Sequence, residues 1–290
     1  MNLLIALFFF LSVILVGLLP FRLLYILSDI NRFVIGKVIR YRNSVIDHNL
    51  QLVFPEMSTQ ERTSLKTQIF KNLADVFLEG IRSFTISRNQ IRKRHRIVNP
   101  EVLEKLYQNG RNIIGVTAHY GNWEWGSLSA NLYTHYRVIA FYKPLSNSYI
   151  DKFIRWSRSR FGTILASIRE TTLTFERYKD TRTIFLMASD QSPARKQKPK
   201  AYWVKFLNQD TAFLHGLENH ARNNDCSVVY VDVQRVRRGY YTIELSILTE
   251  RPNELKPGEL TQLYAQKLES IILKKPENWL WSHRRWKLTR

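Results

Sequence analysis

The chain has 290 residues, with 44 Lys or Arg against 24 Asp or Glu, so its net charge at neutral pH is +20. A hydrophobic content of 44% indicates a globular protein rather than a disordered one, and the length suffices for one large domain or two smaller ones. The single cysteine, Cys226, excludes an intrachain disulfide and lies in an apolar run typical of a core strand. The charge predicts anionic partners: nucleic acid, a membrane surface, a phosphorylated lipid or an acidic carrier protein.

The N-terminal segment is apolar, because no residue from Leu3 to Leu19 is charged. A run of this length is at the lower limit for a spanning helix. It lacks a basic leading segment and a small-residue cleavage site, so we expect a transmembrane or membrane-anchoring helix over residues 1–27. Basic residues follow and place the remainder in the cytoplasm by the positive-inside rule: Arg22, Arg32, Lys37, Arg40 and Arg42. A helix lying in the membrane interface is the alternative.

Residues 28–290 are expected to form a single α/β domain whose N-terminal part, about 44–90, is helical. Apolar residues spaced by three and four from Leu65 to Phe84 predict a long amphipathic helix, which Ser58 and Glu61 begin with a capping box. The basic cluster that follows lacks interleaved aromatic residues, which favours contact with lipid headgroups over nucleic acid.

Strand-like and helical segments alternate after residue 95, which predicts a mostly parallel sheet flanked by helices. The expected strands are 95–99, 113–117, 136–142, 163–167 and 183–188. Beyond them we expect a strand at 202–208, a helix at 210–225 capped by Asp210, a hairpin at 226–248 and a helix at 259–275. The aromatic and basic residues near the end of the chain are typical of a membrane-water interface: Trp279, Trp281, Trp286, Arg284, Arg285 and Lys287.

Residues 112–126, NIIGVTAHYGNWEWG, pass from a buried strand through a turn into a predicted helix over 123–133. His119 falls at the carboxyl end of the strand and Glu124 in the first turn of the helix. Residues five apart do not share a helix face, so the two side chains meet only if the chain turns at Gly121. The alternative is a structural histidine and a solvated glutamate.

A histidine beside a carboxylate can act as a general base. The sequence has no G-x-S-x-G elbow, so we expect acyl transfer in which His119 takes a proton from a substrate hydroxyl or amine that attacks a thioester. Arg158, Arg160 and a backbone N–H near Gly121 qualify as stabilisers of the oxyanion. Zinc, P-loop and Rossmann signatures are missing, so neither a metal nor a cofactor is expected.

The segment AHYGNWE resembles the His-x4-Asp/Glu motif of glycerolipid acyltransferases, and the whole chain resembles the bacterial lipid A late acyltransferases, the lauroyl and myristoyl transferases. The resemblance extends through NLQLVFPEMSTQER, YKPLSNSYIDKFIRWSRSRFG, ASDQSP, VKFLNQDTAFLHGLENHARNND and PENWLWSHRRWK. It implies a glycerolipid acyltransferase-like fold.

The resemblance also implies a function. A membrane-bound enzyme on the cytoplasmic face of the bacterial inner membrane would move a fatty acyl chain from acyl carrier protein, or acyl-CoA, to a hydroxyl of a lipid A precursor. His119 would be the base and Glu124 its partner. The implied substrate-binding residues are Lys143, Arg158, Arg160, Asp190, Gln191, His283, Arg284 and Arg285.

One departure from the family pattern leaves the acceptor open. Where its lipid A members often have Asp-His-Asp-Tyr-Gly, this chain has Asp-Gln-Ser-Pro at residues 190–193. The acceptor alternatives are an amino-lipid, a lysophospholipid or a glycolipid such as mannosylated phosphatidylinositol. A membrane-tethered protein that binds anionic lipid or nucleic acid without catalysis is the alternative from another class.

Overall fold

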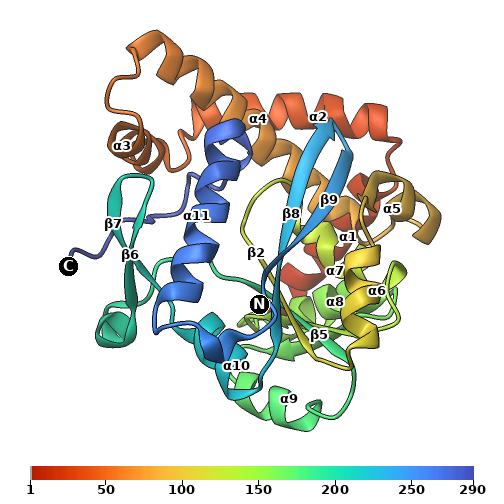
Figure 1. Ribbon diagram of the computed structural model, residues 1–290. Helices are drawn as coiled ribbons and strands as arrows, with labels where there is room; N and C mark the ends of the chain where they lie inside the picture. Colours follow the sequence, from red (N-terminus) through yellow and green to blue (C-terminus); the bar gives the residue numbers. More distant parts are fainter. Residues whose placement is uncertain (1) are drawn as a thin grey trace.

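A seven-stranded sheet runs through the computed structural model, which describes residues 2–290 (Figure 1). Its strands stand in the order β1 (His95–Ile97), β9 (Tyr240–Thr249), β8 (Ser227–Arg237), β2 (Ile113–Thr117), β5 (Thr183–Ala188), β3 (Arg137–Tyr142) and β4 (Ile164–Ser167). The run from β8 to β4 is parallel, whereas β9 is antiparallel to β8 and β1 pairs parallel with β9. The predicted α/β fold with a mostly parallel sheet is confirmed.

Helices cover both faces of this sheet. Successive residues of a strand point to opposite sides, and in these strands both sets are apolar, so each face needs a cover. On β2, Ile114 and Val116 join the cluster that includes α11, while Ile113 joins the cluster of α6 and α7. Figure 1 shows α11 on one side of the sheet and α6 on the other. The helices of the domain are α3 (Asn43–Val53), α4 (Thr59–Arg82), α5 (Arg88–Arg94), α6 (Glu101–Gln108), α7 (Gly126–Ser129), α8 (Ser148–Ser159), α9 (Thr171–Arg177), α10 (Gly216–Asn223) and α11 (Glu259–Lys274).

The long amphipathic helix predicted from residue 58 is α4. The Ser58 hydroxyl accepts the N–H of Glu61, and the Glu61 carboxylate accepts the N–H of Ser58, so the capping box is confirmed. The predicted helix over 123–133 is instead a 3-10 turn (Trp123–Trp125), the single turn α7, and a second 3-10 turn (Ala130–Leu132).

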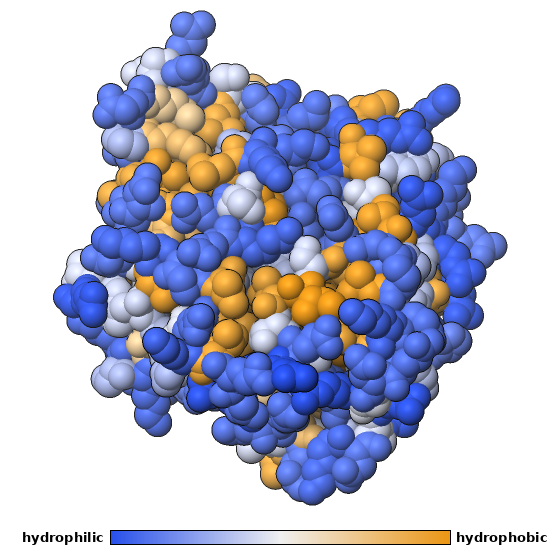
Figure 2. Space-filling view, in the orientation of Figure 1, coloured by the Kyte–Doolittle hydropathy of each residue, from blue (hydrophilic) through white to orange (hydrophobic). Residues whose placement is uncertain are grey.

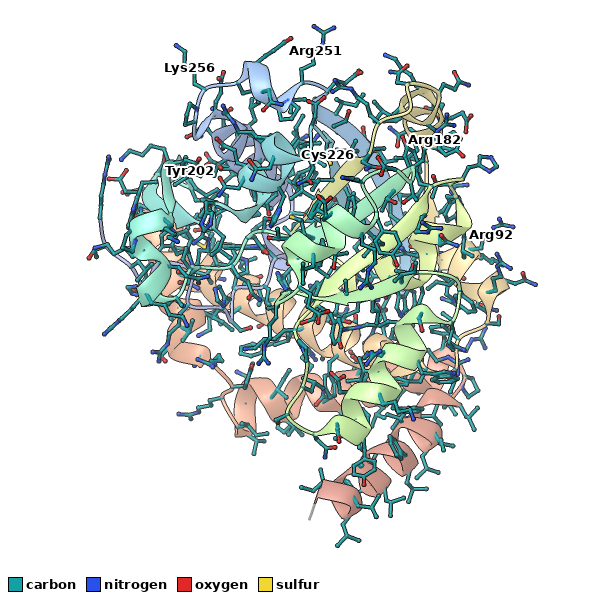
Figure 3. The ribbon with its side chains drawn as sticks, turned by 90° about the horizontal axis from the view of Figure 1, so that it is seen from below. Arg92, Arg182, Tyr202, Cys226, Arg251 and Lys256 are labelled. Carbon is teal, nitrogen blue, oxygen red and sulfur yellow. The ribbon has the colours of Figure 1, made fainter. Side chains whose placement is uncertain are left out.

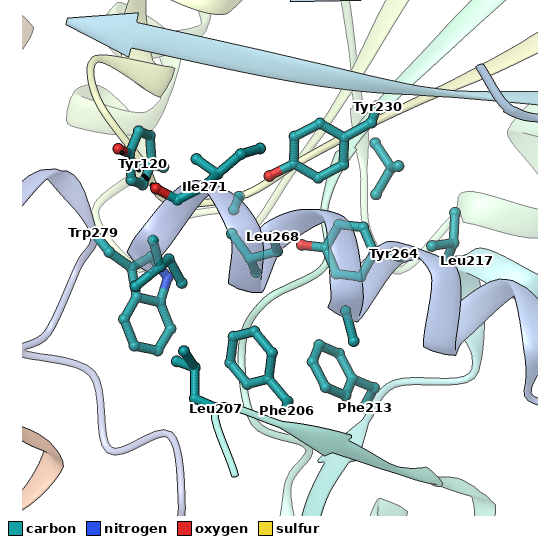
Figure 4. Packing of buried hydrophobic residues seen from close by; sticks show 14 of the residues in the cluster. Tyr120, Phe206, Leu207, Phe213, Leu217, Tyr230, Tyr264, Leu268, Ile271 and Trp279 are labelled. Carbon is teal, nitrogen blue, oxygen red and sulfur yellow. Dashed lines mark hydrogen bonds between the residues drawn. The ribbon is translucent and has the colours of Figure 1, made fainter. Parts of the chain in front are cut away.

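The terminal tryptophans belong to the core, which corrects the expectation of a membrane interface. Trp279 and Trp281 are 3% and 0% exposed. Figure 4 shows Trp279 near Phe206 and α11 residues Leu268 and Ile271. The segment after α11 passes the carboxyl end of β2. There Leu280 donates its N–H to the carbonyl of His119, which joins the end of the chain to the turn after β2.

Residues 202–213 form a hairpin apart from the main sheet, so the expected helix start at Asp210 is wrong. Strand β6 (Tyr202–Phe206) pairs antiparallel with β7 (Gln209–Phe213). Leu207 and Asn208 connect them with φ of 51° and 61°, the positive values that two-residue hairpin turns require. The helix α10 begins only at Gly216.

The N-terminal segment forms two helices, α1 (Asn2–Gly17) and α2 (Phe21–Phe33), followed by a π-helical turn (Val34–Val38). Pro20 separates the two helices. At 1.5 Å per residue α1 reaches roughly 24 Å, short of a hydrocarbon core of about 30 Å. Among residues 2–290 no helix has both the length and the apolarity needed to cross a bilayer, so the spanning helix expected over residues 1–27 is not supported. Figure 3 shows α1 at one edge of the molecule with its side chains projecting outward.

Candidate active site

His119 and Asp190 meet because their strands are neighbours. In the parallel pair β2 and β5, Thr117 is in register with Ala188, so both strands end at the same edge. There His119 Nδ1 lies 2.6 Å from Asp190 Oδ1, and the backbone N–H of His119 donates to Oδ2 at 3.0 Å. Asp190 is 3% exposed, and the indole N–H of Trp279 donates to its Oδ2 at 3.0 Å. The carboxylate therefore fixes both the ring and the backbone of His119.

The two charges shift each other's pKa. Burial disfavours the imidazolium of His119, but the charge and the hydrogen bond of Asp190 outweigh burial, and Glu124 adds to them, so the pKa of His119 is raised. Burial likewise opposes ionisation of Asp190, yet the charge and hydrogen bonds of His119 and the bond from Trp279 lower its pKa to about 2. Asp190 is thus a stable anion at neutral pH.

The second ring nitrogen of His119 points away from Asp190. Neutral His119 donates Nδ1–H to Asp190, which leaves the lone pair on Nε2. The Nε2 atom lies 3.2 Å from the side-chain nitrogen of the exposed Gln191, and the ring of Trp123 packs edge-on against the imidazole at 5.2 Å between centroids. A substrate hydroxyl that displaces the Gln191 amide would find a proton acceptor at Nε2.

Glu124 pairs with Arg158 and not with the ring of His119, which corrects the pairing expected from the sequence. The carboxylate of Glu124 lies 2.5 Å from Arg158 Nη2 on α8. Both side chains are partly exposed, at 32% and 29%. Because residues 123–125 form a 3-10 turn rather than an α-helix, Glu124 faces α8 while staying close enough to raise the pKa of His119.

The turn at Gly121 is present as predicted. Gly121 has φ of +57°, and a Cβ there would lie 2.5 Å from the carbonyl oxygen of Val233, so only glycine fits. Its N–H donates to the carbonyl of Asn278 at 3.0 Å. Asn122 follows as the N-cap, and its side-chain oxygen accepts the N–H of Trp125.

A cavity of about 390 Å³ opens at these residues. Its charged and titratable lining residues include His119, Glu124, Lys143, Arg158 and His95, and Thr117, Ser127 and Ser129 add hydroxyl groups. The remainder is mostly aliphatic and includes Ile97, Leu103, Ile113, Leu165, Ile184, Leu186, Val229, Val231, Val233, Ile243 and Leu245. Residues from both ends of β2 line it, so the cavity runs along that strand on the face opposite α11. Its shape and chemistry suit a long alkyl chain with a reactive group near His119.

The remaining predicted site residues separate into two groups. Lys143 is exposed at the cavity, and Gln191 lies at His119. His283 lies behind Asp190: its Nε2 accepts the N–H of Ser192 at 3.1 Å, and burial lowers its pKa to about 4. Arg284 is exposed.

Two predicted substrate-binding arginines bind the protein's own backbone instead. Arg160 donates to the carbonyls of Ser83 and Ile86 at the end of α4. Arg285 is 1% exposed, donates to the carbonyl of Ala212 at 2.8 Å and lies over the ring of Phe213. The geometry gives both a structural position, away from the lining of the cavity.

Comparison with known proteins identifies the chain's relatives. Residues 2–288 match the family model described as bacterial lipid A biosynthesis acyltransferase. A lipid A biosynthesis lauroyltransferase of Escherichia coli (strain K12) is 24% identical over 87% of this chain and 81% of its own length. A lipid A biosynthesis acyltransferase of Haemophilus influenzae is 23% identical over 92% and 83%, and a palmitoleoyltransferase of Escherichia coli is 23% identical over 86% and 80%.

Proposed function

Because the chain belongs to the bacterial lipid A biosynthesis acyltransferase family and is an O-acyltransferase, we propose that it moves a fatty acyl chain from a thioester to a hydroxyl of a lipid A precursor. The proposed donor is acyl carrier protein, with acyl-CoA as the alternative. The observation that carries the proposal is the hydrogen-bonded pair His119 and Asp190 at the polar end of an aliphatic cavity.

His119 acts as the general base in this proposal. Its Nε2 takes the proton of the acceptor hydroxyl while the oxygen attacks the thioester carbonyl. The tetrahedral intermediate then collapses, the C–S bond breaks, and the leaving thiolate takes the proton back from the imidazolium. Asp190 holds the ring with Nε2 toward the substrate and stabilises the imidazolium, as the carboxylate of a catalytic triad does.

Arg158 is the best-placed cation for the negative charge of the intermediate. Arg160 is bound to backbone carbonyls, and of the backbone N–H groups near Gly121, that of Gly121 itself donates to Asn278. Arg158 lines the cavity and is held by Glu124. With Lys143 it also provides positive charge for a phosphorylated acceptor.

The fatty chain of the donor occupies the aliphatic part of the cavity along β2. The small residues of α7 and the strand residue Gly115 keep this space open. Burying the chain there brings the thioester to the end of the strand at which His119 lies.

The enzyme works on a membrane surface, with α1 and α2 lying in the interface and the catalytic domain on the cytoplasmic face of the bacterial inner membrane. Supporting this, both helices and the turn after them expose apolar side chains: Leu3, Leu4, Ile5, Leu7, Phe8, Leu11, Ile14, Leu15, Leu23, Ile26, Ile30, Phe33 and Val38. Basic residues border them, as anionic headgroups favour. The face seen in Figure 2 is mostly hydrophilic, with apolar residues gathered at its upper left and in a band across its middle.

Transfer of radiolabelled acyl chains from acyl carrier protein, measured in membranes bearing His119→Ala, tests the function. We expect transfer to be lost while expression and membrane association persist. Unchanged transfer would leave a lipid- or nucleic-acid-binding protein as the better description. Mass spectrometry of lipids from a deletion strain identifies the acceptor, which is the molecule that lacks one acyl chain.

A further inference from the structure

Hydrogen bonds from distant parts of the chain converge on one buried carboxylate, that of Glu79 on α4. Its Oε1 accepts the hydroxyl of Tyr25 at 2.8 Å, and its Oε2 accepts Asn122 Nδ2 at 2.6 Å and the hydroxyl of Tyr241 at 2.7 Å. Its backbone carbonyl accepts the indole N–H of Trp125 at 2.9 Å. Glu79 is 0% exposed, and burial raises its pKa despite these bonds.

A buried carboxylate is costly, so its contacts point to what it holds in place. Glu79 is not among the residues that line the cavity, yet its donors Asn122 and Trp125 lie on either side of the lining residues Trp123 and Glu124. Glu79 therefore contacts the active-site turn and does not contact the space for the substrate.

Asn122 transmits this contact. Its amide presents oxygen to the N–H of Trp125 and nitrogen to Glu79 Oε2, so these two contacts together fix the orientation of the amide. His95 fixes the other side of the residue: its Nε2 lies 3.1 Å from the Asn122 carbonyl. Because burial lowers the pKa of His95 to about 4, the ring stays neutral at physiological pH.

Tyr25 joins the same carboxylate to the N-terminal helices. It lies on α2, which is also held to the domain by Arg238, whose guanidinium pairs with Asp29 on α2 and Asp75 on α4. Helix α2 and the active-site turn are thus both hydrogen-bonded to the same buried side chain, Glu79.

We propose that Glu79 is a positioning residue that fixes the turn between His119 and Glu124 through Asn122 and links that turn to α2 through Tyr25. Its catalytic consequence rests on the proposed acyl transfer, whereas the rigidity of the turn can be measured without any substrate. In this proposal α2 helps to hold the active-site turn in place, because Tyr25 donates to the carboxylate that also holds Asn122.

Reversing the hydrogen bond tests the proposal. In Asn122→Asp two carboxylates face each other, and we expect kcat to fall at least about tenfold with KM within about twofold. Adding Glu79→Gln supplies an amide donor to the carboxylate introduced by Asn122→Asp, so the double variant should recover at least about fivefold of the lost kcat. A double variant no faster than Asn122→Asp would overturn the proposal.

Hydrogen exchange of full-length protein, followed by mass spectrometry of the peptide 119–126, provides the readout that is independent of activity. We expect faster exchange there in Glu79→Gln and in Tyr25→Phe, and recovery of protection in the double variant relative to Asn122→Asp. If Tyr25→Phe changes exchange only within α2, the link to the N-terminal helices is absent.

Two matched controls separate positioning from general loss of stability. Glu218→Gln removes another fully buried carboxylate, which accepts the N–H groups of Gly258 and Thr261 between α10 and α11. Tyr136→Phe removes another buried hydroxyl bond, to the carbonyl of Arg111. Both should leave exchange in 119–126 and kcat unchanged, and equal effects in these controls would contradict the proposal.

If the wild-type protein shows no acyl transfer, the proposed function fails, while the exchange data still decide whether Glu79 positions the turn.

Discussion

Asp190 Oδ1 lies 2.6 Å from Nδ1 of His119, although 71 positions separate the two residues along the chain. The contact exists because β2 and β5 are adjacent parallel strands. It makes Asp190 the residue that sets both the orientation and the pKa of the proposed base.

Asp190→Asn should lower kcat by about a hundredfold or more, because the ring loses its oriented tautomer and the imidazolium its counter-charge. His119 must be neutral to act as a base, so activity rises with pH through its pKa. Asp190 raises that pKa against burial, and without its carboxylate only the weaker influence of Glu124 opposes burial. The acidic limb of the kcat/KM profile should therefore move to lower pH, as a pH series would show. Asp225→Asn, at a surface ion pair, is the control, and an unmoved limb would argue against the pairing.

Arg158→Lys should reduce kcat by at least about tenfold, because one ammonium cannot both pair with Glu124 and reach the developing oxyanion as a guanidinium can. Steady-state kinetics with a fixed donor and acceptor measure the effect. Arg155→Ala, an exposed residue on the same helix, should leave kcat unchanged. Equal rates in Arg158→Lys and wild type would remove Arg158 from the mechanism.

Gly115→Ala should shift the donor preference to shorter acyl chains. An added Cβ would lie 2.6 Å from Leu186 and 3.3 Å from Ile184, both in the cavity lining, so the side chains must move into the space for the acyl chain. Competition between donors of different length, analysed by mass spectrometry, gives the result. Ile114→Val changes the opposite face of β2 and should cost about 1 kcal/mol of stability without changing the preference.

Leu4→Asp combined with Phe8→Asp should weaken binding to anionic vesicles by at least about tenfold, because each side chain contributes roughly 1.5–3 kcal/mol when its apolar surface is buried. The two residues are 71% and 75% exposed, one turn apart on α1. Vesicle co-sedimentation measures the binding. Leu173→Asp, on α9 and 70% exposed, is the control, and a similar loss there would point to a different membrane-binding face.

Much of the sheet could be predicted from the sequence because its strands are short apolar runs bounded by polar turns. Residues 113–117 and 183–188 are examples, and both fall within the predicted limits. The hairpin at β6 and β7 could not be predicted in the same way, since the helical pattern of residues 210–225 concealed a turn that depends on positive φ at Leu207 and Asn208.

The sequence predicted which residues belong to the candidate site better than it predicted which of them contact one another. His119 at a strand end followed from local sequence, but its partner depends on strand order, which places β5 directly beside β2. Local sequence suggested Glu124 because it is near in the chain. Trp279, which donates to Asp190, carried no local signal at all, and its tryptophan character suggested a membrane interface instead.

The contacts of residues 278–280 with the turn at His119 have a consequence for biosynthesis. Asn278 accepts the N–H of Gly121, Trp279 donates to Asp190, and Leu280 donates to the carbonyl of His119. The ribosome makes His119 and its turn long before this segment. Under the proposed function, α1 and α2 are therefore made and can meet the membrane while the base is still unfixed. We expect acyl transfer to begin only after residues 278–280 have packed beside the carboxyl end of β2.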